Sequence, residues 1–342
     1  PSNIFIFGTT GTGKSVAIRY IFNELRAANP EHIEAIYVNC KLRTVSDTEY
    51  RLLSYILREF GYKVPDTGLP TEVLYNKFFE IVDAREQIVI LALDELDALI
   101  GKIGDGVLYN LTRANTELKR ARIAIIGISN NLSFTDDIDP RVKSSLSVEE
   151  IIFPPYNAIQ LKDILMSRSG MALREGAYNE AVVGRCAAMA AQEQGDARRA
   201  LDLMRVAAEI AERNDEYVVQ EKHVALAEQK LELDRVVELA KTQPRHSQLI
   251  LYSILKLFEK GQDNILTGDV YDIYIGLCKK NGYRVLTQRR ISDLISELDM
   301  LGLVSTKVIS KGRYGRTRQI RVAIAKRPFD LLKSHFSGMF EL

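Results

Sequence analysis

The sequence predicts an α/β domain built on a parallel sheet, followed by an α-helical segment and a winged-helix domain. In the first part, helical patterns alternate with apolar runs, which favours a parallel sheet covered by helices on both faces. The strand-like runs are 4–7, 33–40, 87–93, 122–129 and 151–153. Apolar residues then recur at helical spacing alone from residue 157 to 235, and the last of these helical patterns spans 220–234. Near the C-terminus, three helical patterns precede two strand-like runs. We therefore expect domains at residues 1–153, 154–240 and 241–342.

Composition and charge are those of an ordinary globular protein. Hydrophobic residues make up 46 % and charged residues 27 % of the 342. No apolar run approaches the roughly 20 residues of a membrane span, so we expect no membrane partner. The three cysteines are far apart and odd in number, which argues against a disulfide framework and indicates a cytoplasmic location.

A glycine-rich loop follows the first apolar run. Residues 4–7 read IFIF, residues 8–15 read GTTGTGKS, and a helical pattern begins at Val16, so the pattern G-x-x-x-x-G-K-[ST] stands between a strand and a helix. A glycine-rich turn that carries Lys-Ser by chance would not need these flanks. The glycines let backbone N–H groups point at phosphates, and the helix N-terminus adds positive potential. We expect Lys14 to reach the β- and γ-phosphates, Ser15 to ligate Mg²⁺, and ATP or ADP to contact Gly8, Thr9, Thr10, Gly11, Thr12, Gly13, Lys14, Ser15 and Val16.

Two later apolar runs end in polar side chains. Residues 87–93 lead into Asp94 and Glu95, which predicts Asp94 in the Mg²⁺ shell and Glu95 as the group that orients or deprotonates water. Residues 122–129 lead into Asn130, which either holds the water near the γ-phosphate or caps the following turn. Parallel strands end at one edge of a sheet, so Gly8, Asp94 and Asn130 are expected there together.

Three segments together resemble the archaeal Orc/Cdc-type replication initiators, AAA+ ATPases related to the eukaryotic origin recognition complex and its loading factor. The segments are Asn130, the run DPRVKSSL at 139–146 and the run GDAR at 195–198. The resemblance covers essentially the whole chain. It implies an AAA+ base, a lid, slow ATP hydrolysis with ADP often retained, and duplex origin DNA as partner. Other initiator copies or paralogues and the replicative helicase are further partners that it implies, with a nucleoid-associated location.

The resemblance also implies roles for single residues. Asn130 matches the sensor-1 position, and Arg198 matches the sensor-2 arginine that contacts the nucleotide from the lid. Read without the resemblance, Arg198 is equally a surface arginine at a helix terminus. Arg141 lies where family members carry an arginine that approaches a neighbouring subunit's nucleotide, whereas eukaryotic relatives place an arginine where Ser145 stands. The stretch 45–75 matches a helical insertion that touches DNA in the family. The usual base contacts precede the P-loop, so we expect the sequence to be truncated at its start.

The C-terminal part carries most of the positive charge. Between Lys279 and Arg327 thirteen Lys and Arg residues stand against three acidic residues, while the whole chain has a net charge of only +1. Such a block is either a solvated charged surface or a module that binds a polyanion. The winged-helix pattern favours the second reading, with a protein-contacting winged helix as the alternative.

The third helical pattern of this module opens with Thr287, just where a recognition helix presents side chains to the major groove. The opposite stripe, Ile291, Leu294, Ile295 and Leu298, is expected to face the core. A glycine-punctuated basic turn at 310–318 predicts the wing. Tyr314 on it is either a packing or a stacking residue. The predicted DNA contacts are Thr287, Gln288, Arg289, Arg290, Lys311, Arg313, Tyr314, Arg316 and Arg318.

Together these features predict a replication initiator that binds duplex DNA at chromosomal origins and switches conformation with its ATP or ADP state. A clamp-loader or helicase-type AAA+ motor is one alternative, and it would show stimulated multiple turnover in a closed ring. A STAND-type ATPase transcription regulator is another, although it would need a signal-sensing repeat domain. A purely architectural DNA-binding protein would not need the complete P-loop.

Overall fold

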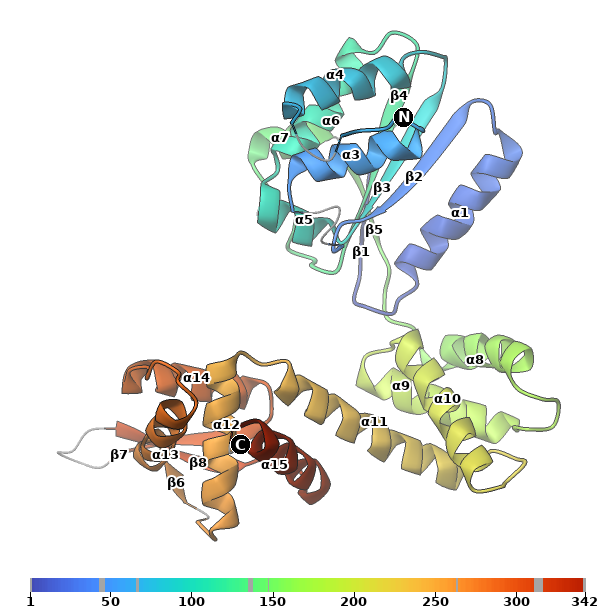
Figure 1. The fold of residues 1–342 in the computed structure, drawn as a ribbon. Helices are drawn as coiled ribbons and strands as arrows, with labels where there is room; N and C mark the ends of the chain where they lie inside the picture. The colour runs from blue at the N-terminus through green and yellow to red at the C-terminus, as the bar shows by residue number, and fades with distance from the viewer. Residues whose placement is uncertain are drawn as a thin grey trace. The chain divides into compact units, whose positions relative to one another are not determined.

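The computed structural model describes residues 2–42, 47–65, 68–134, 138–146, 148–262, 264–310 and 316–340. The chain forms two compact units, Pro1–Glu221 and Lys222–Leu342 (Figure 1). Within the described ranges, no helix combines the length and the apolar character that crossing a membrane requires.

The first unit contains the predicted parallel sheet. Its five strands lie in the order β2-β3-β4-β1-β5, and every neighbouring pair is parallel. Four strands coincide closely with the predicted ones, whereas the fifth begins three residues before the predicted Ile151, because Asn3 of the first strand pairs with Val148. The strands are β1 (Asn3–Phe7), β2 (Ile33–Asn39), β3 (Ile88–Asp94), β4 (Arg122–Ser129) and β5 (Val148–Ile152).

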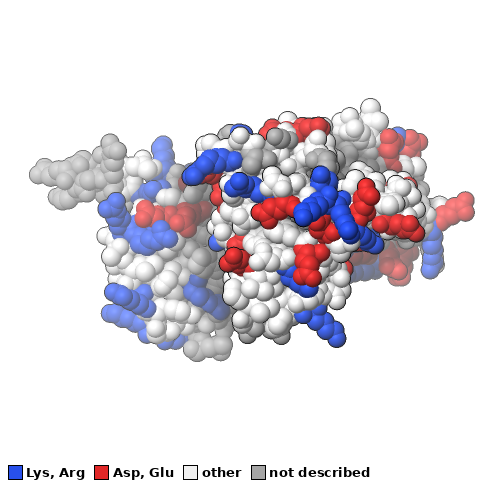
Figure 2. Space-filling model, turned by 90° about the horizontal axis from the view of Figure 1, so that it is seen from above, with Lys and Arg blue, Asp and Glu red and all other residues white. Residues whose placement is uncertain are grey.

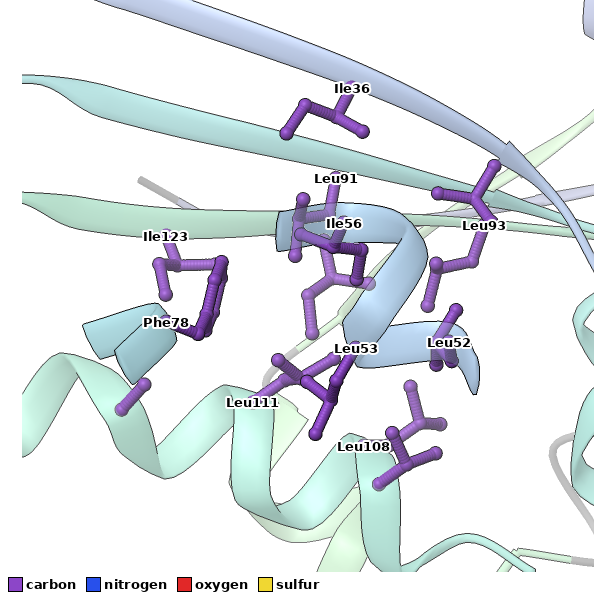
Figure 3. Packing of buried hydrophobic residues seen from close by; sticks show 14 of the residues in the cluster. Ile36, Leu52, Leu53, Ile56, Phe78, Leu91, Leu93, Leu108, Leu111 and Ile123 are labelled. Atoms are coloured by element: carbon purple, nitrogen blue, oxygen red, sulfur yellow. The ribbon is translucent and has the colours of Figure 1, made fainter. Parts of the chain in front are cut away.

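Helices cover both faces of this sheet, as expected. On one face, Ile18 and Phe22 of α1 pack against Ile6, Ala92 and Ile128. The other face carries the larger core, in which strand residues meet side chains from α3, α4 and α6 (Figure 3). The helices of this part are α1 (Lys14–Ala28), α3 (Glu49–Glu59), α4 (Thr71–Val82), α5 (Leu96–Ile103), α6 (Gly106–Glu117) and α7 (Pro140–Leu146).

An all-helical segment follows the sheet, as the apolar spacing predicted. Side-chain caps mark its helix starts: Asn157 and Gln160 form a capping box, Asn179 accepts the backbone N–H of Val182, and Asp196 accepts those of the next helix. The last helix of the segment continues seven residues beyond the predicted Asp234. The helices are α8 (Ala158–Ala172), α9 (Glu180–Glu193), α10 (Ala197–Arg213) and α11 (Glu221–Lys241).

The second unit contains most of α11 and a winged helix, which confirms the predicted fold. A three-stranded antiparallel sheet in the order β6-β8-β7 packs beside its helices. The final helix was not predicted; Phe336 and Phe340 on it are buried against Tyr252. The elements are α12 (Arg245–Glu259), β6 (Ile265–Leu266), α13 (Thr267–Lys280), α14 (Gln288–Met300), β7 (Val304–Ser310), β8 (Arg316–Val322) and α15 (Lys326–Phe340).

Candidate nucleotide site and DNA interface

One edge of the sheet collects the predicted nucleotide-binding residues. β1 ends at Phe7, just before Gly8, β3 ends at Asp94, and β4 ends one residue before Asn130. Phe7 pairs with Ser129, and Asp94 pairs with Asn39 of β2. Since all these strands are parallel, their carboxyl ends lie side by side, as the sequence predicted.

The glycine loop has the backbone that the motif requires. Gly11 and Gly13 adopt φ values of 77° and 85°, which favour glycine, and α1 begins directly after them at Lys14. The Lys14 ammonium is buried and donates to the carbonyl oxygens of Gly8 (2.8 Å) and Thr9 (2.7 Å). The cation is therefore held over the loop, with the helix N-terminus beside it.

The charge of Arg198, the predicted sensor arginine, acts on this lysine. Burial lowers the pKa of Lys14, the Asp94 carboxylate opposes that shift, and the positive charge of Arg198 lowers the pKa further. Two cations from different helices thus approach the same loop. A polyphosphate bound there would relieve their mutual repulsion.

Ser15 and Asp94 meet at the start of α1. The Ser15 hydroxyl donates to Asp94 Oδ2 over 2.6 Å, the Tyr37 hydroxyl donates to the same oxygen, and the Glu95 N–H donates to Oδ1 over 2.9 Å. An alcohol and a carboxylate oxygen beside a phosphate-binding loop are ligands of the kind that Mg²⁺ takes. The donor set therefore fits a magnesium ion, which Ser15 and Asp94 would hold.

Glu95 is held in an unusual backbone conformation. Its φ of 58° lies in the left-handed region, and its carboxylate pairs with Lys41 at 3.3 Å. It follows Asp94 directly, so its side chain leaves the same strand end. Lys41 follows β2, so the Glu95 side chain extends toward the neighbouring strand end.

Asn130 lies just beyond β4 and is exposed. Its neighbour Ser129 is buried and donates to Asp97 Oδ1 over 3.0 Å, while the Asn131 N–H donates back to the Ser129 hydroxyl over 3.0 Å. This local network fixes the end of the strand. Asn130 therefore projects from a rigid base at the predicted edge.

The start of α10 lies directly against the glycine loop. The Ala197 N–H donates to the Gly11 carbonyl over 3.2 Å, and a Cβ added to Gly11 would lie 1.7 Å from Asp196 Oδ1. Tyr156 also reaches the loop, because a Cβ on Gly13 would lie 2.4 Å from its hydroxyl. Sequence reasoning missed both contacts. The position of Asp196 at a helix start was the one local signal, and it concerned the contact with Gly11. Loop and lid are thus in contact at two glycines.

Gly11→Ala is expected to weaken ATP binding by at least about tenfold. The substitution adds backbone strain of about 1 kcal/mol at positive φ and displaces Asp196, which caps α10 through two backbone N–H groups. Gly61→Ala is the matched control, because Gly61 has a φ of 78° with no atom near its missing Cβ. Fluorescence titration with labelled ATP measures the effect. Equal affinity in both variants would contradict the lid contact.

Arg141 is not among the side chains gathered around Lys14 and Asp94 in the described structure. It lies in the first turn of α7, is 87 % exposed, and pairs with Asp139 at 3.3 Å. Hydrogen bonding from the Arg141 backbone N–H, and then from its side chain, lowers the pKa of Asp139. The predicted role toward a neighbouring subunit stays a prediction.

The predicted recognition helix, α14, has the expected buried and exposed faces. Ile291, Leu294, Ile295 and Leu298 are buried, whereas residues 287–290 are exposed. The Thr287 side chain accepts the Arg290 N–H over 3.4 Å, so it caps the helix, and the Arg290 guanidinium lies 3.5 Å from Glu297. Gln288 and Arg289 continue the exposed face. The helix thus presents basic and amide side chains on the side away from the core.

Two tyrosines of α13 hold Leu286, the residue before the cap of this helix. The Tyr274 hydroxyl accepts the Leu286 N–H over 3.3 Å, and the Tyr271 hydroxyl donates to the Leu286 carbonyl over 3.3 Å. His246 Nδ1 lies 2.8 Å from the Tyr274 hydroxyl and completes the cluster. These contacts fix where α14 begins, and with it the exposed residues of its first turn.

The wing is only partly described. Arg318 lies within β8, opposite Val308, so the predicted turn at 310–318 is shorter than expected, since β8 already begins at Arg316. At the left of Figure 2, where this unit is seen, blue side chains outnumber red ones. Among the predicted contacts, Lys311, Arg313, Tyr314 and the side chain of Arg316 lie outside the described residues.

This chain is similar to known DNA replication proteins. Family models match three parts of the chain: an AAA domain at residues 1–133, the Cdc6 AAA+ ATPase-type lid domain at 162–229, and the CDC6 C-terminal winged helix domain at 238–329. The ORC1-type DNA replication protein of Thermococcus onnurineus is 52 % identical over 331 residues, covering 95 % of this chain and 79 % of its own.

Solved structures agree with these matches. The structure of the Aeropyrum pernix ORC1 protein in complex with DNA is similar with a TM-score of 0.79 and 42 % identity, covering 98 % of this chain and 87 % of that one. The Aeropyrum pernix ORC2 protein, in ADPNP-ADP complexes, shares the fold with a TM-score of 0.57 at 20 % identity, over all of this chain and 89 % of its own.

Proposed function

This chain belongs to the family of archaeal ORC1-type DNA replication proteins, and from that membership we propose that it binds duplex DNA at replication origins under the control of bound ATP or ADP. The observation that carries the proposal is the likeness to the DNA-bound ORC1 structure over 98 % of the chain. A complete P-loop, with Lys14 and the Ser15–Asp94 pair in place, supports the nucleotide control.

In the proposed cycle, the P-loop N–H groups and Lys14 bind the phosphates. Ser15 and Asp94 would hold Mg²⁺, which would supply charge neutralisation at the phosphates. Glu95 accepts a proton from the attacking water, and Asn130 orients that water from the neighbouring strand end. Arg198 contacts the nucleotide from the start of α10. Because α10 touches the loop at Gly11, a change at the γ-phosphate is expected to change the lid angle.

DNA binding is proposed for α14 and the wing. Gln288, Arg289 and Arg290 contact the major groove, while Arg316 and Arg318 contact phosphates or a narrow minor groove, together with Lys311, Arg313 and Tyr314. Thr287 serves first as the cap of α14. The net positive charge of this part of the sequence supplies the attraction to phosphate that makes such binding depend on salt.

Finer features of the initiator are part of the same proposal. We place domain boundaries at 153/154 and 240/241, and infer slow hydrolysis, with the protein acting as a switch. From the family's role we also propose further partners, namely other initiator copies or paralogues and the replicative helicase. The same role implies that the protein associates with the nucleoid. Family membership favours this reading over a clamp-loader or helicase-type motor and over a STAND-type regulator.

Fluorescence anisotropy with origin-derived and shuffled duplexes tests the function. At one stated salt concentration, we expect tighter binding to the origin duplex, with affinities that differ between ADP and ATP. Equal binding to both duplexes would leave only electrostatic attachment and favour a motor or loader. An absence of binding to either would exclude the DNA-binding function.

Glu95→Gln is expected to lower ATP hydrolysis about 100-fold or more, since general base catalysis commonly contributes a factor of that order. The amide keeps the size and hydrogen-bonding reach of the carboxylate but cannot accept a proton from water. Single-turnover hydrolysis of radiolabelled ATP measures the rate, and labelled ATP binding should stay within about twofold of the native protein. An unchanged rate would show that Glu95 is not the general base.

A further inference from the structure

The Asp94 carboxylate receives three hydrogen bonds, of which one comes from outside the predicted motifs. Ser15 and Tyr37 both donate to Oδ2, while the Glu95 N–H donates to Oδ1. Tyr37 belongs to β2, which lies next to β3 in the sheet. Its hydroxyl is therefore the contact that β2 makes with the proposed metal-binding carboxylate.

The ring of Tyr37 is held on both sides. It is partly buried in the core between α1 and the sheet, together with Ile6, Ile18 and Ala92. The Arg19 guanidinium lies over the ring, 4.3 Å from its centroid. Arg19 stands one helical turn after Ser15, so α1 contacts Asp94 and its tyrosine partner from the same side.

The Tyr37 hydroxyl is the donor of its pair with Asp94, because a carboxylate offers only acceptor oxygens. Its hydrogen bond to Oδ2 and that of the Glu95 N–H to Oδ1 hold both oxygens of the group. These contacts therefore restrain the rotation of the carboxylate.

We propose that Tyr37 is a positioning residue of the magnesium site, which fixes Asp94 Oδ2 beside the Ser15 hydroxyl. The inference rests on the proposed ATP-dependent function. Partners of metal ligands orient the ligands and raise metal affinity, commonly by about 10- to 100-fold. Tyr37 acts through Asp94, so it touches neither the nucleotide nor the reacting atoms.

Tyr37→Phe tests this assignment because it removes the hydroxyl and leaves the ring under Arg19. We measure binding of labelled ADP in EDTA and then across a Mg²⁺ titration. The expected result is unchanged affinity in EDTA and a Mg²⁺ midpoint raised about 10-fold or more. Tyr75→Phe is the matched control, since Tyr75 donates to the Glu49 carboxylate elsewhere in the same unit and its loss should leave the midpoint unchanged.

The outcomes separate the inference from the proposed function. An unchanged Mg²⁺ midpoint in Tyr37→Phe overturns the inference. Weakened ADP binding already in EDTA also overturns it, because the hydroxyl would then support the whole loop. A native protein that binds no nucleotide with or without Mg²⁺ would refute the proposed function itself. Ser15→Ala, which removes a direct ligand, should raise the midpoint at least as much as Tyr37→Phe.

Discussion

Lys14→Ala is expected to weaken ATP and ADP binding by about 100-fold or more. The ammonium now donates to the Gly8 and Thr9 carbonyls and would donate to phosphate oxygens in the bound state. Hydrogen bonds to charged groups contribute about 1.5–3 kcal/mol each, so two of them correspond to a loss of this size. Titration with labelled nucleotide measures the change.

Folding must be checked in the same experiment, because Lys14 is only 6 % exposed. Thermal unfolding without nucleotide reports the stability of the loop variant. Lys77→Ala serves as the matched control, since Lys77 lies on α4 and pairs with Glu80. Nucleotide binding by Lys14→Ala that matches this control would contradict the assignment of the P-loop.

The double variant Arg289→Ala/Arg318→Ala is expected to bind duplex DNA about 100-fold more weakly at fixed salt. Each lost base contact removes about 1–3 kcal/mol, and each lost phosphate contact lowers the slope of log affinity against log salt by about 0.9. Arg289 follows the capped start of α14, and Arg318 lies in the hairpin opposite Val308. Anisotropy titrations between low and moderate salt give both quantities.

Arg205→Ala is the control for a general loss of positive charge. Arg205 lies on α10 and pairs with Asp202 and Glu209, so its removal should leave DNA affinity unchanged. If the double variant kept the native salt slope and affinity, α14 and β8 would not be the DNA-contacting elements. The winged helix would then serve a protein partner.

The sequence predicted the parts of the fold that local patterns specify. The strand, loop and helix around Lys14 follow from apolar periodicity and glycine spacing, and the stripe from Ile291 to Leu298 is buried as expected. Element boundaries were predicted least well where one or both faces of an element are exposed to solvent. β5 starts earlier than predicted because it is an edge strand, in which Glu149 and Glu150 interrupt any apolar run.

The missed elements depend on tertiary contacts. α15 carries apolar residues at helical spacing, but Phe336 and Phe340 identify it as core only once Tyr252 is placed beside them. Likewise, the distance in sequence between Tyr37 and Asp94 hides their hydrogen bond, because strand order decides that β2 neighbours β3. The contact of Asp196 with Gly11 is similarly invisible until the lid is folded.

Glu95 occupies a backbone conformation that any side chain disfavours. Keeping a non-glycine residue at a φ of 58° costs on the order of 1–3 kcal/mol. The ion pair of Glu95 with the exposed Lys41 offsets little of this free-energy cost. Glycine would relieve the strain but remove the carboxylate. Under the proposed role of Glu95 in hydrolysis, drift toward stability and selection for turnover oppose each other at this position, and a lineage that lost the need to hydrolyse ATP would be free to replace it.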